Sequence, residues 1–411
     1  MTLKDVVAMD AADVLVSKRA EFVLPADTIY LDGNSLGCLP LAAKLRAYQV
    51  VEQQWGQDLI KSWNVHHWID LPVSCGEKIA RLIGAGPGQV ICCDSISVNL
   101  FKLLSAAVMM QKGRSIVVSQ QGNFPTDLYM VQGLQDLLGA DLCRLQSVED
   151  QHLEDSLTED VAVLLLSHVN FRSGLVYDMH RLTQLAHAKG IVVIWDLAHS
   201  AGVLPVQLDA CDVDFAVGCG YKYLNGGPGA PAFMYVATRH QDTIRQPLTG
   251  WMGHKTPFEF DAKYVAADGM ARFLAGTPPV LSMSVLDAAL DVFADVDMCQ
   301  IREKSLALSR LFMRLVAESS ALGELVLDSP ADDNQRGSQL AYRHPEAYAI
   351  CQAMIARGII GDFRAPDIFR VGFNPLYLSF QDIYSSVRVL ADVVASQAWR
   401  EPRYRQRSRV T

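Results

Sequence analysis

Short runs of hydrophobic residues alternate with stretches of helical periodicity between about residues 90 and 240. The runs are rich in Val, Ile and Leu and do not alternate with polar residues, which is typical of strands buried on both faces. These predicted strands cover 115–120, 161–169, 191–199, 214–220 and 230–236. Helices are predicted at 126–139 and 179–190, where each stretch ends on a glycine. Strands that alternate with helices predict an α/β fold with a mostly parallel sheet.

The pattern changes in the last third of the chain. A long helical stretch is predicted over 281–318. Further predicted elements are a strand at 340–344, a helix at 346–358, a strand at 369–374 and a helix from 379. We therefore expect a large α/β domain over 30–280 and a smaller α+β domain formed by 1–29 and 281–411. The tail, with five arginines between 400 and 409, is expected to be solvated and frayed.

Composition narrows the class of protein. The formal net charge of −9 argues against a nucleic-acid partner, because phosphate backbones bind basic surfaces. The first thirty residues carry no secretory signal, and no stretch reaches the roughly 18 apolar residues of a membrane span. We expect a cytoplasmic protein without a membrane partner. The nine cysteines show no CxxC spacing, which is typical of reduced, buried thiols rather than of a disulfide framework or a metal site.

Polar residues that could carry chemistry follow the predicted strands. Asp196 ends one strand and His199 follows it by one turn, Ser167 ends another, and Tyr221 and Lys222 follow a third. The carboxyl ends of parallel strands meet in one crevice. Alone, Asp196 could be a helix cap and His199 a core histidine. Together with Lys222 they predict an acid, an imidazole and an amine at one rim of the sheet.

The stretch around Lys222 reads GCGYKYLNGGPG. A lysine amine in an apolar site is more easily neutral, which is the condition for Schiff-base chemistry with an aldehyde cofactor. Such a cofactor would need a carboxylate, an aromatic ring and a phosphate cradle. Ser97, where a helix is predicted to begin, could offer an anion site or be only an N-cap. Phe124 could cover a ring face or belong to the core.

Several motifs resemble those of the kynureninase family. They are YLDGNSLGCLP at 30–40, FPTD at 124–127, WDLAHSAGVLPV at 195–206, GCGYKYLNGGPGAPAF at 218–233, GWMGH at 250–254 and RVGFNPLY at 370–377. The resemblance covers about residues 28–390. It implies pyridoxal 5′-phosphate on a fold-type-I (aspartate-aminotransferase) architecture with a seven-stranded type of sheet. It also implies hydrolysis of the Cβ–Cγ bond of L-kynurenine to anthranilate and L-alanine, in tryptophan catabolism and towards NAD biosynthesis.

The resemblance assigns roles to individual residues. Lys222 would be the Schiff-base lysine, Asp196 the partner of the pyridine nitrogen and Tyr221 a proton donor. Cofactor contacts are implied for Ile96, Ser97, Phe124, Pro125, Thr126, Asp127, Ser167, His199, Tyr221, Trp251 and Thr277. Trp251 and Thr277 would reach the cofactor from the neighbouring subunit, so that a homodimer is implied.

The substrate would be held by residues outside the α/β segment. The resemblance makes Arg370 the partner of the substrate α-carboxylate, because a guanidinium binds a carboxylate bidentately; an exposed arginine at a sheet edge is the alternative. Ser35, Trp63 and Gly276 would complete the substrate site. Trp63, Gly276 and Thr277 together resemble the bacterial branch that prefers L-kynurenine and acts more slowly on 3-hydroxykynurenine, although Trp63 could equally be a packing residue.

Two other functions remain open. A cysteine desulfurase of the same fold would need an exposed, activated cysteine on a mobile loop after Lys222, whereas Cys299 and Cys351 both lie in helical patterns. A binding or regulatory module without activity would not need Lys222, Asp196 and Arg370 together.

Overall fold

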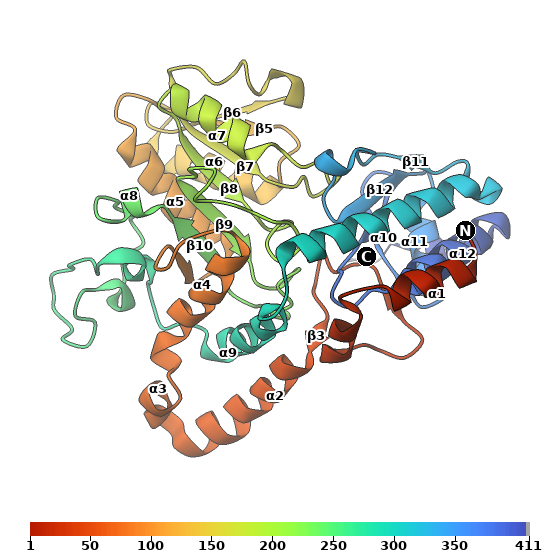
Figure 1. Cartoon of the computed structure of the whole chain (residues 1–411). Coiled ribbons are helices and arrows are strands. Elements are labelled where there is room, and N and C mark those ends of the chain that lie inside the picture. Colours follow the sequence, from red (N-terminus) through yellow and green to blue (C-terminus); the bar gives the residue numbers. More distant parts are fainter. Residues whose placement is uncertain (408–411) are drawn as a thin grey trace.

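The computed structural model describes residues 1–407, and Figure 1 shows two sheets in separate regions of the molecule. The larger sheet has seven strands in the order β4-β10-β9-β8-β7-β5-β6. Its strands are β4 (Val90–Cys92), β5 (Ile116–Gln120), β6 (Arg144–Val148), β7 (Val161–Ser167), β8 (Val192–Asp196), β9 (Phe215–Cys219) and β10 (Ala232–Val236). Strands β6, β5, β7, β8 and β9 run parallel, whereas β10 is antiparallel to both neighbours. The prediction of a mostly parallel α/β sheet is confirmed.

Helices cover both faces of this sheet, which explains why its strands lack polar alternation. The helices are α4 (Leu71–Leu82), α5 (Ile96–Met110), α6 (Pro125–Leu138) and α7 (Met179–Ala188). Leu164 of β7 belongs to the same buried cluster as residues of α4 and α7. Its neighbours Val163 and Leu165 belong to a second cluster with residues of α5 and α6. The two cores lie on opposite faces because successive strand residues point in opposite directions.

The smaller sheet has four antiparallel strands in the order β11-β12-β15-β14. The elements of this region are α1 (Leu3–Ala11), α10 (Met298–Glu318), β11 (Val326–Leu327), β12 (Gln339–Arg343), α11 (Ala347–Ile355), β14 (Asp362–Arg364), β15 (Ile368–Gly372), α12 (Phe380–Ala395) and α13 (Pro402–Arg405). Helix α1 packs against α12, and β2 (Ile29–Tyr30) pairs with β13 (Ile359–Ile360). The N-terminal segment therefore lies with the C-terminal part of the chain.

The helix predicted over 281–318 is two helices. Helix α9 (Val280–Ala289) is followed by a short 3-10 helix over Leu290–Phe293. Helix α10 begins after Asp297, whose carboxylate accepts a hydrogen bond from the amide of Cys299. The prediction missed this N-cap. Because α9 packs against α2 (Leu41–Gln49) and α4, residues just beyond 280 lie with the larger sheet. The exact bounds of the two domains stay a prediction.

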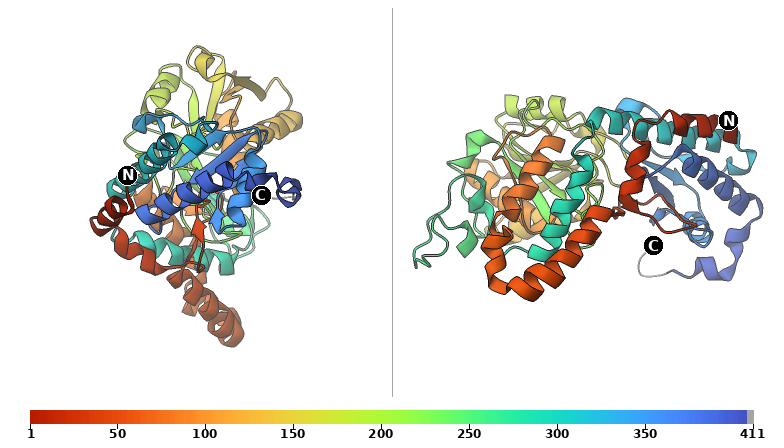
Figure 2. Two further views of the ribbon diagram at one scale, coloured as in Figure 1. Left: turned by 90° about the vertical axis from the view of Figure 1, so that its right-hand side faces the viewer. Right: turned by 60° about the horizontal axis from the view of Figure 1, so that its bottom comes forward.

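A helical arm extends from α2 through residues 50–58 to α3 (Ser62–Val65), and Figure 2 shows it projecting away from the rest of the chain. Its large apolar side chains are exposed, among them Leu45, Trp55 and Ile60 at 61%, 62% and 77%. The remaining short elements are β1 (Phe22–Val23), β3 (Leu39–Pro40) and α8 (Thr238–Gln241).

The C-terminal tail is packed rather than frayed as far as it is described. Tyr404 is buried, and the guanidinium of Arg407 lies 5.5 Å from the ring centroid of Phe363. The arginines of this segment are exposed, as expected, while Arg409 lies outside the described residues. No helix within residues 1–407 is both long enough and apolar enough to cross a membrane.

Candidate active site

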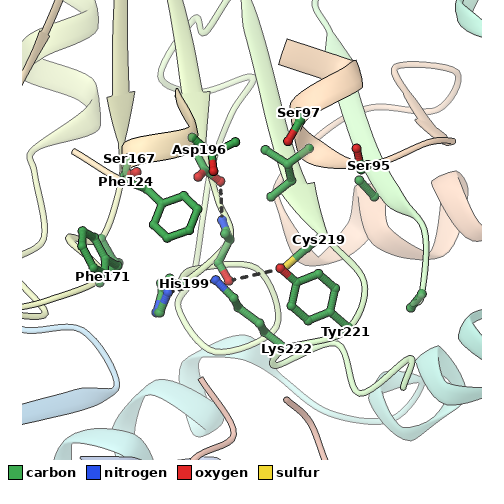
Figure 3. Close-up of a pocket in the computed structure, with 16 residues that line it drawn as sticks. Ser95, Ser97, Phe124, Ser167, Phe171, Asp196, His199, Cys219, Tyr221 and Lys222 are labelled. Carbon is green, nitrogen blue, oxygen red and sulfur yellow. Dashed lines mark hydrogen bonds between the residues drawn. The ribbon is translucent and has the colours of Figure 1, made fainter. Parts of the chain in front are cut away.

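A pocket of about 320 Å³ opens at the carboxyl ends of the parallel strands (Figure 3). Nine of its lining residues are among those named by the sequence: Ile96, Ser97, Phe124, Thr126, Ser167, Asp196, His199, Tyr221 and Lys222. The others are Ser95, Val169, Phe171, Ala198, Cys219, Ala230 and Ala232. We call this the lysine pocket.

The loop after β9 carries Lys222 into the pocket. The Lys222 Nζ lies 3.0 Å from Nε2 of His199 and 5.8 Å from the ring centroid of Phe124. The glycines of this loop allow close approach of backbones: a Cβ on Gly226 would lie 2.8 Å from the carbonyl oxygen of Gly220. Gly227 has a φ of +82°, which favours glycine. The glycine-rich stretch thus folds the chain tightly around the lysine.

Two buried carboxyl groups lie close enough to the amine to feel its charge. Asp196 ends β8, and its Oδ1 accepts a hydrogen bond of 2.8 Å from the amide of Ala198. Asp127, in the first turn of α6, is fully buried, and neither of its carboxylate oxygens has a hydrogen-bond partner. The nearby Ser167 hydroxyl donates instead to Asn123. Asp127 does not line the pocket but lies directly behind it, next to Asp196.

Burial controls the protonation of these carboxyl groups. Desolvation raises the pKa of Asp127 well above its usual value, the charge of Asp196 adds to this, and the charge of Lys222 opposes it. Desolvation also raises the pKa of Asp196, again against the charge of Lys222. Because two adjacent buried carboxylates disfavour double ionisation, the pair retains a proton or requires a cationic partner.

His199 is a neutral imidazole between two partners. Its Nδ1 lies 2.8 Å from Oε1 of Gln339, a residue of β12 in the smaller sheet. Burial and the charges of Lys222 and Arg370 lower the pKa of His199 well below its usual value. The interpretation of His199 as an ordinary core residue is therefore incomplete, because it faces the pocket.

Two helix N-termini meet at the pocket. Helix α5 begins at Ile96, and its N-cap is Ser95, which accepts from the amide of Val98 at 3.4 Å. Ser97 is therefore not the cap but lies in the first turn, whose free amides favour an anion. Thr126 lies in the first turn of α6. It follows Pro125, which is the first residue of the helix, where a missing amide hydrogen costs nothing. Pro125 itself does not line the pocket.

Aromatic side chains form another wall. Phe124 is 39% exposed, so that the interpretation as a core residue is wrong. Its ring packs edge to face with Phe171 at 5.3 Å and points into the same space as Lys222 and Asp196 (Figure 3). Tyr221 lies on the other side, and burial raises the pKa of its hydroxyl, with Cys219 as the next cause.

Arg370 lies beside the pocket, in a second group of charges. It is 1% exposed in β15, between β12 and β14, so that the exposed-edge alternative is wrong. Its Nε donates to Asp362 at 2.8 Å and its Nη2 to the hydroxyl of Ser35 at 3.1 Å. Its Nη1 donates to the carbonyl of Phe171, which lines the lysine pocket.

The same group contains two more charged side chains. Arg364 is paired with Asp362 at 2.7 Å, and Asp32 has a buried carboxylate oxygen without a partner. Burial and the neighbouring charge of Asp362 raise the pKa of Asp32 to about 7. We call Asp32, Ser35, Asp362, Arg364 and Arg370 the arginine cluster.

Besides Pro125, Asp127, Ser35 and Arg370, four more residues named from the sequence do not line the pocket of their own chain: Trp63, Trp251, Gly276 and Thr277. The Trp251 ring packs 5.7 Å from that of Phe258, and Gly276 and Thr277 are exposed. The Trp63 ring packs edge to face with Trp68 at 6.1 Å. Their roles stay predictions.

The lysine pocket fits pyridoxal phosphate. It offers an amine for the aldehyde, a buried acid pair in which Asp127 has no hydrogen-bond partner, a ring for stacking and helix N-termini for a phosphate. Three residues around the site were not found from the sequence: Phe171, Gln339 and Asp362. They come from other segments of the chain, and no local sequence pattern marks them. Asp32 stood within the glycine-rich DGNSLG motif, which was a usable signal.

Known proteins are similar to this chain over its whole length. A family model described as "Kynureninase C-terminal domain" matches residues 301–390. The chain is 48% identical to a kynureninase of Burkholderia pseudomallei (strain 1106a) over 415 residues, and 45% identical to that of Pseudomonas fluorescens over 416. Both alignments cover 100% of each chain.

Solved structures share the fold at lower identity. A cysteine desulfurase of Thermococcus onnurineus NA1 is 18% identical with a TM-score of 0.77, covering 92% of this chain and 98% of that one. A structure of C-DES with glycine linked to its PLP cofactor is 18% identical with a TM-score of 0.78, covering 91% and 99%. At such identity, the likeness establishes only that the fold is shared.

Proposed function

This chain belongs to the kynureninase family, and from that premise we propose that it hydrolyses the Cβ–Cγ bond of L-kynurenine, giving anthranilate and L-alanine with pyridoxal 5′-phosphate as cofactor. The observation that carries the proposal is the amine of Lys222 in a pocket backed by the Asp196–Asp127 pair. An amine, a buried acid and an anion site in one cavity are what this cofactor requires.

The residues of the pocket would hold the cofactor in distinct ways. We assign Lys222 to its covalent attachment, Phe124 to ring stacking, and the first turns that contain Ser97 and Thr126 to its phosphate. Asp196, supported by Asp127, would keep a proton on the pyridine nitrogen, because a cation beside this pair relieves the cost of burying its charge. When bound, the cofactor supplies an electron sink for bond breaking at the substrate Cα.

Three side chains would move protons or bind the substrate. The Lys222 amine is the general base that removes the proton from Cα. Tyr221 carries its hydroxyl proton at neutral pH, as an ordinary tyrosine does, and burial raises its pKa further, so that the hydroxyl is the proposed donor of a proton to Cβ. The guanidinium of Arg370 would hold the α-carboxylate next to Ser35, in place of part of its contact with Asp362.

We propose that the protein works as a homodimer in the cytoplasm. Trp251 and Thr277 lie outside the pocket of their own chain, and the helical arm exposes a run of large apolar side chains, as surfaces that bind another protein do. Sedimentation should give twice the chain mass, and Trp251→Ala should weaken cofactor retention without changing the sedimentation of the dimer. A sedimentation pattern of single chains at full activity would contradict the composite site.

We further propose that L-kynurenine is preferred to 3-hydroxykynurenine. If Trp63 lines the pocket for the aromatic ring across the dimer, next to Gly276 and Thr277, its large indole would leave little room and no acceptor for a 3-hydroxyl. Such a pocket discriminates by about ten- to a hundredfold in kcat/KM. The double variant Trp63→His, Thr277→Asn should narrow the gap. Equal kcat/KM values for the two substrates in the unmutated protein would contradict this preference.

A cysteine desulfurase activity is not favoured. Cys299 is exposed, but the neighbouring charge of Asp297 raises its pKa, which opposes activation of the thiol. Cys219 lines the pocket, and burial raises its pKa as well. Cys351 is buried in α11.

The proposed function is tested by product analysis. The purified protein with its cofactor is incubated with L-kynurenine and, separately, with L-cysteine. We expect anthranilate and alanine in equal amounts from the first and no turnover of the second. Alanine from cysteine alone would assign a desulfurase, and no product from either would favour a binding module.

A further inference from the structure

Gln339 carries a buried amide that reaches from the smaller sheet to His199, a residue of the lysine pocket, and it is 1% exposed. Its Nε2 donates to two backbone carbonyls, those of Asn170 at 3.2 Å and Phe171 at 2.9 Å. Carbonyl oxygens accept hydrogen bonds and cannot donate them. The amide nitrogen must therefore face these carbonyls, and Oε1 must face His199.

This orientation fixes the proton on the imidazole. Oε1 of Gln339 can only accept, and it lies 2.8 Å from Nδ1 of His199, so that Nδ1 carries the hydrogen. Burial keeps the ring neutral by lowering its pKa. Nε2 then presents a lone pair to the Lys222 Nζ at 3.0 Å, and the amine donates to it.

We propose that Gln339 is a positioning residue that holds His199 as the Nδ1–H tautomer and thereby orients the Lys222 amine. This role rests on the proposed function of Lys222. The side-chain amide of Gln339 also connects the Lys222 region with Arg370, the proposed partner of the substrate carboxylate. The Phe171 carbonyl that accepts from Gln339 accepts from Arg370 as well, and β12 is paired with β15.

The experiment compares Gln339→Met with a matched control, Gln241→Met. Gln241 is another buried glutamine whose Nε2 donates to two backbone carbonyls, those of Gly88 at 2.9 Å and Val236 at 3.1 Å, and neither of these partners is a histidine. Both variants lose similar amide bonds, so that general destabilisation affects them alike. Only the first removes the acceptor from Nδ1.

Two measurements follow. In protein labelled with ¹⁵N-histidine, with and without added pyridoxal phosphate, two-bond ¹H–¹⁵N correlation spectra identify the tautomer of His199, assigned by the signal missing in His199→Gln. We expect the Nδ1–H form in the unmutated protein and in Gln241→Met, and loss of that form in Gln339→Met. With L-kynurenine, kcat of Gln339→Met should fall about tenfold, the scale of one lost hydrogen bond, while cofactor content is retained.

The inference is overturned if the unmutated protein carries the proton on Nε2, or if Gln339→Met retains the Nδ1–H form. It is also overturned if Gln339→Met and Gln241→Met lose the same fraction of kcat. Absence of kynurenine turnover in the unmutated protein would remove the proposed function but leave the tautomer measurement valid, so that the two failures are distinguishable.

Discussion

The lysine pocket and the arginine cluster differ in how their buried charges are balanced. In the pocket, the Asp127 carboxylate has no hydrogen-bond partner and Lys222 faces a cavity. In the cluster, the guanidinium of Arg370 is saturated by Asp362, Ser35 and a backbone carbonyl. The first arrangement is incomplete without a bound molecule, whereas in the second the guanidinium of Arg370 is already bonded within the chain, although one carboxylate oxygen of Asp32 has no partner. A cofactor can therefore complete the pocket, but a substrate carboxylate must compete for Arg370.

The largest expected effect comes from removing the amine of the pocket. Lys222→Ala should lose the visible absorbance of the bound cofactor and nearly all turnover of L-kynurenine, because it removes the amine that attaches the cofactor and takes the Cα proton. The fold should survive, since Lys222 lies in a loop after β9. Circular dichroism and activity are compared with Lys189→Ala, which removes an exposed lysine. Unchanged turnover would place the chemistry elsewhere.

A smaller loss is expected from the acid of the pocket. Asp196→Asn keeps the shape of the side chain but removes its charge, so that kcat should fall by at least about 10²-fold, the scale of one preorganised electrostatic group. The cofactor should still bind covalently. Steady-state kinetics and the absorbance spectrum check this, and activity near that of the unmutated protein would mean that Asp196 serves only to bond the Ala198 amide.

The arginine cluster should respond differently. Arg370→Lys replaces a planar fork by a point charge, so that kcat/KM for L-kynurenine should fall about tenfold or more with unchanged cofactor absorbance. Arg343→Lys, an exposed arginine on the neighbouring strand, is the control. Loss of the cofactor from Arg370→Lys would mean that Arg370 helps to bind the cofactor, so that the arginine cluster and the lysine pocket would not have separate roles.

The smallest effect concerns stability. The pKa of Asp32 is raised to about 7 from the ordinary value of 3.8, so that the folded chain binds this proton more tightly than the unfolded chain. The resulting stabilisation is present at low pH and is lost as the pH rises through about 7. Asp32→Asn removes this dependence.

Thermal unfolding of Asp32→Asn and the unmutated protein can be compared at about pH 6 and about pH 8. The variant should gain on the order of 1 kcal/mol relative to the unmutated protein over that range. A constant difference would mean that Asp32 stays ionised throughout, paired with the guanidinium groups of the cluster.

The fold was largely predictable because its central strands are buried on both faces. The hydrophobic runs at 161–169 and 191–199 correspond to β7 and β8. Strand β4 was missed because it has only three residues, and β6 because its residues are partly exposed and its pattern is mixed. Local hydrophobicity predicts an element only where burial is continuous.

The site was predictable in its larger part for a related reason. Asp196 and Lys222 follow hydrophobic strands, and the parallel sheet brings their ends together. Gln339 could not be placed, because it meets His199 only after the smaller sheet packs beside the larger one. Asp362 could not be placed either, because it meets Arg370 only through the pairing of β14 with β15. The sequence alone does not distinguish a charged residue that is buried and paired from one that is exposed to solvent.

The most direct test of the difference between the two regions is the point at which the cofactor is attached. The protein is loaded with pyridoxal 5′-phosphate, reduced with borohydride and digested, and the peptides are analysed by mass spectrometry. The account predicts the added mass on Lys222 and on no other lysine, with no labelling in Lys222→Ala. Attachment to another lysine, such as the buried Lys102, would contradict it.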